Sequence, residues 1–294
     1  RFLGAMGGGG EGAVGAARGA EVFPKHARER AGGIFHAASV GGIWLAAAAG
    51  IVVGTHWRYA YLVGIVPALL VLWVRVSIRE PDSWREAKAT KGDRMGSFRE
   101  LLGDPRWRAR ALGGAMLAMV GLATFWGVAV AGQNLAEDLL RKLDAPAAEI
   151  SNRAKIAFGF VQTTGGFLGQ LAMGPMCAWL GRRRTFALMH VAAFVMTLVV
   201  CWVPGYFASY TLLLVLLPIF GFFVQGIHSG YAVYFPELFP THLRATGAGF
   251  CFNTGRILAA PVLIWGSAWM KAAFSLPVAV SVLGGLFLLG LVVL

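Results

Sequence analysis

The octapeptide Glu21-Val-Phe-Pro-Lys-His-Ala-Arg28 recurs, at a constant offset of 216 positions, as Glu237-Leu-Phe-Pro-Thr-His-Leu-Arg244. The two copies share Glu, Phe, Pro, His and Arg at the same five positions. Each copy follows one apolar stretch and precedes another. A loop that recurs between recurring apolar segments predicts a chain built from two parallel copies of one helical unit.

The composition is typical of a membrane protein. Of the residues, 57% are hydrophobic and 14% are charged, whereas a soluble domain carries about 25% charged residues. Long apolar blocks predict an all-α, polytopic helical bundle. The net charge is +12, but the basic residues gather between the apolar blocks, as in cytoplasmic loops that follow the positive-inside rule. We therefore expect a multi-pass protein of the inner or plasma membrane, in contact with the lipid bilayer and with no nucleic-acid partner.

Each of nine apolar segments has roughly the 20 residues that a membrane-spanning helix requires. We predict spanning helices at 1–19, 32–53, 57–78, 111–132, 155–180, 184–203, 210–234, 246–269 and 273–294. The longest polar stretch, 79–110, carries nine Lys or Arg residues, so we expect it in the cytoplasm.

The number of segments differs between the two halves. Four predicted segments lie between the long polar stretch and Glu237, but only one precedes Glu21. If the halves are copies, the parent has six plus six helices and this chain lacks the first three. Residues 1–78 are then the remainder of the N-terminal bundle, 79–110 the central cytoplasmic loop, and 111–294 the C-terminal six-helix bundle.

Further motifs carry a family resemblance. Arg1-Phe-Leu-Gly-Ala-Met-Gly-Gly-Gly-Gly-Glu11 is similar to the pattern R-x-x-x-G-x-G-x-G followed by an acid. Later come Trp57-Arg58 with Pro67, Glu80-Pro-Asp-Ser-Trp84 and Phe250-Cys-Phe-Asn-Thr-Gly-Arg256. With the repeated E-x-x-P-x-x-x-R loop, these motifs resemble the major facilitator superfamily, in its metabolite–proton symporter and sialate–lactate symporter branch. The resemblance implies that the chain holds the fourth to twelfth helices of a transporter.

One motif departs from the superfamily pattern. Gly174-Pro-Met-Cys-Ala-Trp-Leu-Gly-Arg-Arg183 matches G-x-x-x-D-R-x-G-R-R in its glycines and arginines, but Ala178 and Trp179 replace the Asp and Arg. The resemblance implies that this acid helps to latch the cytoplasmic side, so the latch is expected to be weakened here. The predicted cytoplasmic gate, whose ion pairs form in one conformation and break in the other, comprises Glu21, Arg28, Glu237, Arg244, Arg182 and Arg183.

Glu11 lies in the middle of a spanning segment, where an ionisable side chain is costly and marks a functional site. Small residues recur at every fourth position from Gly4 to Ala20, so this helix packs closely against others and Glu11 faces the protein interior. A carboxylate inside the protein suits reversible proton uptake. Glu11 is therefore the predicted proton-coupling residue, and the alternative is a structural, hydrogen-bonded Glu.

Arg256 lies about ten residues into its segment, on one helical face with Gly249, Asn253 and Ala260. Because guanidinium binds carboxylate through two parallel hydrogen bonds, Arg256 is the predicted carboxylate clamp; the alternative is a structural partner for an acid. The other predicted solute-binding residues, for which a helix–helix hydrogen bond is the alternative, are Asn253, Gln225, His228, Gln162, Trp126 and Asn134. We interpret His36, His190 and the three cysteines as structural.

These features indicate a secondary active transporter. It would move a small polar metabolite, a carboxylate or sugar acid, by proton symport and alternating access, as a monomer. A drug-type exporter and a non-transporting solute sensor of the same fold are the alternatives. The sequence contains no P-loop, no metal-ligand spacing and no nucleophile–base pairing, so we expect neither an enzyme nor a bound cofactor or metal.

Overall fold

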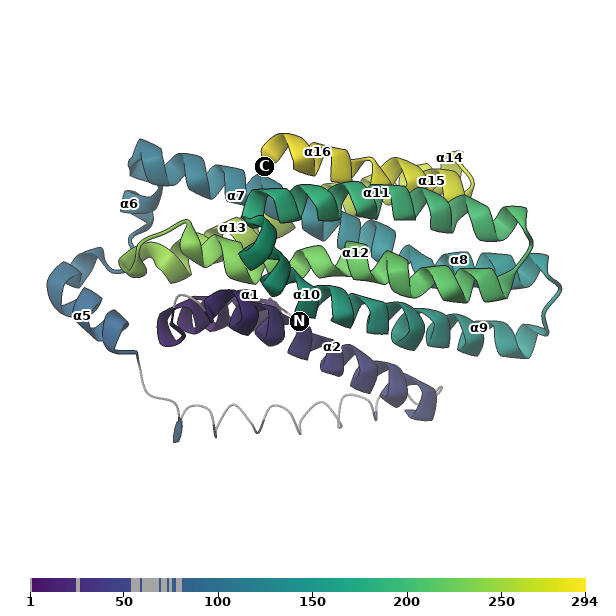
Figure 1. Cartoon of the computed structure of the whole chain (residues 1–294), viewed down its shortest axis with the longest axis horizontal. Helices are drawn as coiled ribbons and strands as arrows, with labels where there is room; N and C mark the ends of the chain where they lie inside the picture. The colour runs from purple at the N-terminus through teal and green to yellow at the C-terminus, as the bar shows by residue number, and fades with distance from the viewer. Residues whose placement is uncertain are drawn as a thin grey trace.

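The protein is a bundle of helices (Figure 1). The computed structural model describes residues 2–24, 27–53, 59, 69, 73, 76, 77 and 81–294, and it contains no strand among them. Within this described part, six helical runs are long and apolar enough to cross a membrane: Arg28–Gly50, Pro105–Lys142, Arg182–Tyr206, Tyr210–Glu237, Thr241–Met270 and Leu276–Val293. The prediction of an all-α polytopic membrane protein is confirmed.

Two helices come from the first part of the chain. They are α1 (Phe2–Val22) and α2 (Arg28–Val53), and they cover the predicted segments 1–19 and 32–53. Helix α1 is not one of the six most apolar runs because it is rich in glycine. The third predicted segment, 57–78, lies outside the described residues except for isolated positions.

The polar stretch 79–110 is folded into short helices: α5 (Asp82–Lys91), η1 (Gly92–Arg94) and α6 (Phe98–Gly103). Helix α7 then begins at Pro105, before the predicted start at residue 111. The Asp104 carboxylate accepts a hydrogen bond from the Arg106 backbone N–H at 2.8 Å, and Pro105 suits the first helical position. A local capping motif, and not the onset of apolar sequence, therefore sets this boundary.

The C-terminal bundle contains three long helical runs that are interrupted by π-helical turns. In chain order its elements are α7 (Pro105–Thr124), η2 (Phe125–Ala129), α8 (Ala131–Lys142), α9 (Ala147–Ile156), η3 (Ala157–Gln162), α10 (Thr163–Leu180), α11 (Arg182–Tyr206), α12 (Tyr210–Glu237), α13 (Thr241–Pro261), η4 (Val262–Gly266), α14 (Ser267–Ala273), α15 (Leu276–Gly284) and α16 (Leu286–Val293). The π turns are η2, η3 and η4, and such turns often occur at functional sites.

Helices α10 and α12 approach each other very closely because glycine occupies the contact. A Cβ atom on Gly165 would collide with the carbonyl oxygen of Pro218, and one on Gly221 would collide with the carbonyl oxygen of Gln162. Apolar side chains gain little by leaving lipid for protein, so close packing of small residues is a main source of helix association in membranes. This contact makes α12 a central element, which also touches α2, α7, α11 and α13.

The two N-terminal helices lie along one side of the C-terminal bundle (Figure 1). Helix α1 packs against α13, α2 packs against α10, and both contact α12. We call the surface between α1 and α2 on one side and α10, α12 and α13 on the other the seam. Any relative movement of the N-terminal and C-terminal helices must change the contacts along this surface.

Candidate functional site

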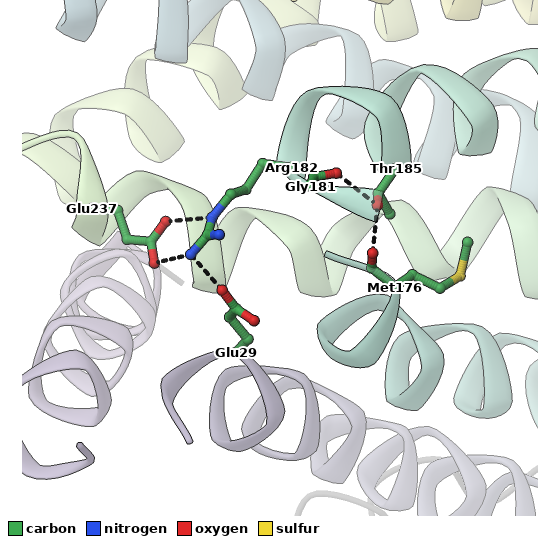
Figure 2. Close-up of polar contacts among 6 residues, drawn as sticks. All are labelled: Glu29, Met176, Gly181, Arg182, Thr185 and Glu237. Carbon is green, nitrogen blue, oxygen red and sulfur yellow. Dashed lines mark hydrogen bonds and ion pairs between the residues drawn. The ribbon is translucent and has the colours of Figure 1, made fainter. Parts of the chain in front are cut away.

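An arginine at the start of α11 joins two acidic side chains from different helices (Figure 2). The Arg182 guanidinium donates from Nε to Oε2 of Glu237 at 2.9 Å and from Nη2 to Oε1 at 2.8 Å. The same Nη2 lies 2.5 Å from Oε1 of Glu29. Glu237 ends α12, whereas Glu29 belongs to α2. Arg182 therefore links the C-terminal bundle to the N-terminal helices across the seam.

The turn between α10 and α11 positions this arginine. Gly181 has a φ of +82°, a conformation that favours glycine. The Thr185 hydroxyl donates to the Gly181 carbonyl and to a carbonyl near the end of α10, each at 2.9 Å (Figure 2). The glycine and arginine of the latch motif thus hold a defined geometry, although Ala178 and Trp179 replace its usual acid and base and both are exposed.

A second ion pair crosses the seam between the repeated octapeptides. Arg244 Nη1 lies 3.3 Å from Glu21 Oε1, and both side chains are largely buried. Arg244 Nε also donates to the Pro236 carbonyl at 3.1 Å, and in the first octapeptide Arg28 Nε donates to the Phe23 carbonyl at 2.9 Å. Each repeated arginine therefore donates a hydrogen bond to a backbone carbonyl near its own loop. Arg244 also pairs with Glu21 of the other octapeptide.

These charged residues form one group at the end of the seam. We call Glu21, Glu29, Arg182, Glu237 and Arg244 the ion cluster. It includes four of the six predicted gate residues; Arg28 braces its own loop, and Arg183 is exposed beside the cluster. The opening and closing of this cluster stays a prediction.

Two cavities of about 70 Å³ each lie along the seam. Half of the residues that line the first cavity have aromatic rings, among them His36, Tyr231 and Phe252. The second extends to Arg28 and to Glu237 of the ion cluster. The lining residues that the two cavities share are Ala16, Phe35 and Ala232. The cavities therefore follow one another from the middle of the seam to its charged end.

Arg256 and Asn253 lie on α13 close to the seam. Asn253 Nδ2 donates to the carbonyls of Gly9 on α1, at 3.0 Å, and of Gly249, at 2.9 Å. The Arg256 side chain is exposed, and its guanidinium carbon lies 5.2 Å from the centroid of the Phe252 ring, a cation–π contact. Because Phe252 lines the first seam cavity, the predicted carboxylate-binding arginine is adjacent to that cavity.

Three other predicted solute-binding residues are buried within the helix packing. Gln162 Nε2 donates to the Ala129 carbonyl at 2.9 Å, which joins η3 to η2. His228 Nε2 faces the Gly121 carbonyl at 3.1 Å, and Gln225 is 2% exposed at the contact between α10 and α12. None of the three lines a seam cavity. Gln162 and His228 form helix–helix hydrogen bonds, whereas the buried Oε1 of Gln225 has no hydrogen-bond partner among the described residues.

The last two predicted solute-binding residues lie elsewhere. Trp126 and Asn134 line a cavity of about 180 Å³ between η2, the α8 start, η4 and α15. The structure therefore divides the predicted solute-binding residues among three places: the α13 face, the interior packing and this further cavity. Their role in binding a solute stays a prediction.

The side chain of Glu11 lies outside the described part of the structure, but its position on α1 does not. The next residue, Gly12, lines the first seam cavity. One turn later, a Cβ atom on Gly15 would lie 2.7 Å from Cζ of Phe35 on α2. Since residues four apart share a helical face, position 11 lies on the side of α1 that faces α2.

The gate residues predicted from the sequence did not include Glu29, which contacts Arg182. Glu29 corresponds to Ala245 in the second copy, so a search for repeated positions does not find it. Glu29 could have been found from the sequence because it is an acid that directly follows the repeated Arg28 at the start of an apolar helix. His36, interpreted as structural, lines the first seam cavity and stacks against His228, with ring centroids 6.3 Å apart.

Comparisons with known proteins agree with this architecture. The sequence model of the Major Facilitator Superfamily matches residues 1–262. A probable 4-methylmuconolactone transporter of Cupriavidus pinatubonensis is 29% identical over 88% of this chain and 59% of that protein. A cis,cis-muconate transport protein of Acinetobacter baylyi is 30% identical over 82% of this chain and 57% of its own length. A sialic acid transporter of Escherichia coli is 27% identical over 90% of this chain and 62% of its own length.

The chain therefore spans about three fifths of the length of these three relatives. All three are named as transporters, and none is named as an enzyme.

Proposed function

We propose that this chain, which belongs to the Major Facilitator Superfamily and is a multi-pass protein of the cell membrane, acts in secondary transport of a small organic carboxylate by proton symport and alternating access. The observation that carries the choice of solute is Arg256, an exposed arginine within the apolar run Thr241–Met270. An intramembrane guanidinium needs a partner. Its contact with Phe252 leaves the hydrogen-bonding edge of the guanidinium for a carboxylate.

The names of the relatives support this class of solute. Muconate and sialic acid, which appear in the names of two of these relatives, both carry carboxylate groups. The aromatic wall of the first seam cavity, which includes Phe35, Tyr231, Phe235 and Phe252, suits a planar, conjugated solute because aromatic faces stack. We propose that Arg256 binds the carboxylate at the edge of this aromatic surface.

The ion cluster supports alternating access. Its pairs Arg182–Glu29 and Arg244–Glu21 join the N-terminal helices to the C-terminal bundle at one end of the seam. We propose that these pairs hold the cytoplasmic end closed and break when the two sets of helices rock apart around the bound solute. Glu11, on the side of α1 that faces α2, is the proposed proton carrier.

The carboxylate clamp is tested by substitution of Arg256 in the transporter expressed from its whole reading frame. Lysine keeps the charge but loses the two-pronged geometry, so both Arg256→Lys and Arg256→Ala should weaken the apparent affinity for muconate roughly ten- to a hundredfold. The matched control is Arg153→Lys, because Arg153 also lies over an aromatic ring, that of Tyr210, but far along the chain on α9. Unchanged affinity in both Arg256 variants would leave this arginine structural.

Proton coupling is tested by Glu11→Gln, which removes the titrating group but nearly preserves shape. Uphill uptake of muconate driven by a pH gradient should be lost, whereas exchange of labelled for unlabelled solute should persist, because exchange requires rocking of the helices but no net proton movement. Both assays use the same vesicles. Undiminished gradient-driven uptake in the variant would remove Glu11 from the mechanism.

A further inference from the structure

Two histidines from opposite sides of the seam meet inside the bundle. His36 belongs to α2 and His228 to α12. Their ring planes are inclined by only 15°, with the centroids 6.3 Å apart. The His228 ring also makes edge contacts with Phe125 and Tyr231, at centroid distances of 4.5 and 5.5 Å. A ring contact between an N-terminal and a C-terminal helix can exist only while that part of the seam is closed.

The hydrogen bond of His228 fixes which of its nitrogens is available to bind a proton. Its Nε2 lies 3.1 Å from the Gly121 carbonyl, and because a carbonyl oxygen only accepts, Nε2 carries the hydrogen. The Nδ1 nitrogen is then the basic site of the neutral ring. No hydrogen bond to the His36 ring occurs among the described residues. The stacked pair can accept one proton, whereas two adjacent imidazolium rings would repel each other.

A route leads from His36 to the charged end of the seam. His36 lines the first seam cavity, and the second cavity continues from it to Glu237. Each cavity has a volume of about 70 Å³, whereas one water needs only about 10–15 Å³ of such volume. Phe35, like Ala16 and Ala232, lines both cavities, so these three residues mark where the cavities adjoin.

Other ionisable groups near the pair are few. Tyr231 on α12 contacts His228, Arg256 on α13 lies one turn beyond the cavity residue Phe252, and Glu11 on α1 precedes the cavity residue Gly12. Helix α7 between residues 111 and 124 and helix α10 between residues 163 and 176 contain no ionisable side chain. On α2 itself, Glu29 and Arg30 lie almost two turns away, at the cytoplasmic end.

We propose that His36 and His228 form a proton-binding pair that receives the symported proton from the α1 side and releases it from His36, through the two seam cavities past Phe35, toward Glu237 and the cytoplasm. This inference rests on the proposed proton symport and adds the step between Glu11 and the cytoplasmic face. In each step the proton leaves a protonated group and binds the lone pair of the next acceptor, which is a neutral imidazole, a water molecule or the Glu237 carboxylate, so one N–H or O–H bond is broken and one is formed. Contact of the rings limits the pair to one proton while the seam is closed, and opening of the seam at the ion cluster then lets that proton leave toward the cytoplasm.

The test uses His36→Gln and His228→Gln in the transporter expressed from its whole reading frame, in membrane vesicles with muconate as the solute. In both variants, accumulation driven by a pH gradient should fall to equal concentrations inside and outside, while solute exchange continues. The matched control is His190→Gln. His190 is also fully buried and bonded to a backbone carbonyl, that of Phe186 at 2.7 Å, but it lies on α11, away from the seam, and its substitution should leave accumulation intact.

The outcomes separate this inference from the proposed function. If the unmodified transporter shows no accumulation driven by a pH gradient, proton symport itself fails, and the pair has no proton to carry. If the unmodified transporter accumulates solute and both variants do so equally, the inference alone is overturned. If a variant also loses solute exchange, its transport data no longer test proton binding. Ring ¹⁵N NMR of the purified, unmodified protein then shows directly whether the two histidines bind a proton. Of the six histidines in this chain, those assigned to the pair must bind a proton when the pH is lowered and must change on solute addition; failure to do either overturns the inference.

Discussion

Removal of the charge on Glu29 should open the cytoplasmic end of the seam. Glu29→Gln weakens the contact with Arg182 across the seam but leaves both hydrogen bonds from Arg182 to Glu237 in place. A hydrogen bond between charged groups contributes about 1.5–3 kcal/mol. The Arg182 side chain is 37% exposed and that of Glu29 13%, so solvent screening reduces this contribution to about 1 kcal/mol. That free energy corresponds to a roughly fivefold shift toward the open arrangement.

Cysteine labelling measures this shift. Ala232 lines both seam cavities, and the three native cysteines are buried, so Ala232→Cys reports access to the seam. In inside-out vesicles, a membrane-impermeant maleimide should react roughly five times faster when Glu29→Gln is present. The matched control is Glu149→Gln, which removes an exposed ion pair with Arg153 on α9 and should leave the rate unchanged.

Two results would refute the reasoning. An unchanged labelling rate in Glu29→Gln would show that its contact with Arg182 does not hold the seam closed. Equal acceleration by Glu149→Gln would show that loss of any surface carboxylate has this effect. A double-mutant cycle with Arg182→Gln adds a quantitative check, because the effects of the two substitutions should be less than additive if the side chains act as one pair.

Three further predictions concern stability and electrostatics. Gly165→Leu should prevent folding, because its side chain would collide with the Pro218 carbonyl. Gly113→Leu should be tolerated, because nothing lies within 4 Å of a Cβ atom at that position. Size-exclusion profiles in detergent show whether each variant is folded. Gln162→Leu removes the hydrogen bond to the Ala129 carbonyl and should lower the free energy of unfolding by about 1 kcal/mol, which a lower thermal unfolding midpoint would reveal. High salt should accelerate maleimide labelling of the Ala232→Cys variant, because mobile ions screen the partly exposed ion cluster. An unchanged labelling rate would contradict this.

The helices and their class follow from local properties of the sequence. A run of about 20 apolar residues predicts a spanning helix wherever it occurs, because burial in lipid requires the backbone to satisfy its own hydrogen bonds. The repeated octapeptides likewise placed Glu21 of the first copy and Arg244 of the second copy among the predicted gate residues, and the structure pairs the two. The start of α7 differed from the prediction because a capping residue, Asp104, precedes the apolar run and extends the helix toward the polar side.

The composition of the site depends on tertiary structure. Helical periodicity tells which residues share a face of one helix, but the rotation and axial register of that helix against its neighbours arise from packing such as the glycine contacts of α10 with α12. For this reason the sequence alone could not separate Gln162, bonded inside the bundle, from Arg256 beside the seam cavity. It also could not show that His36 on α2 meets His228 on α12, because residues almost two hundred positions apart come together only when the two sets of helices pack across the seam.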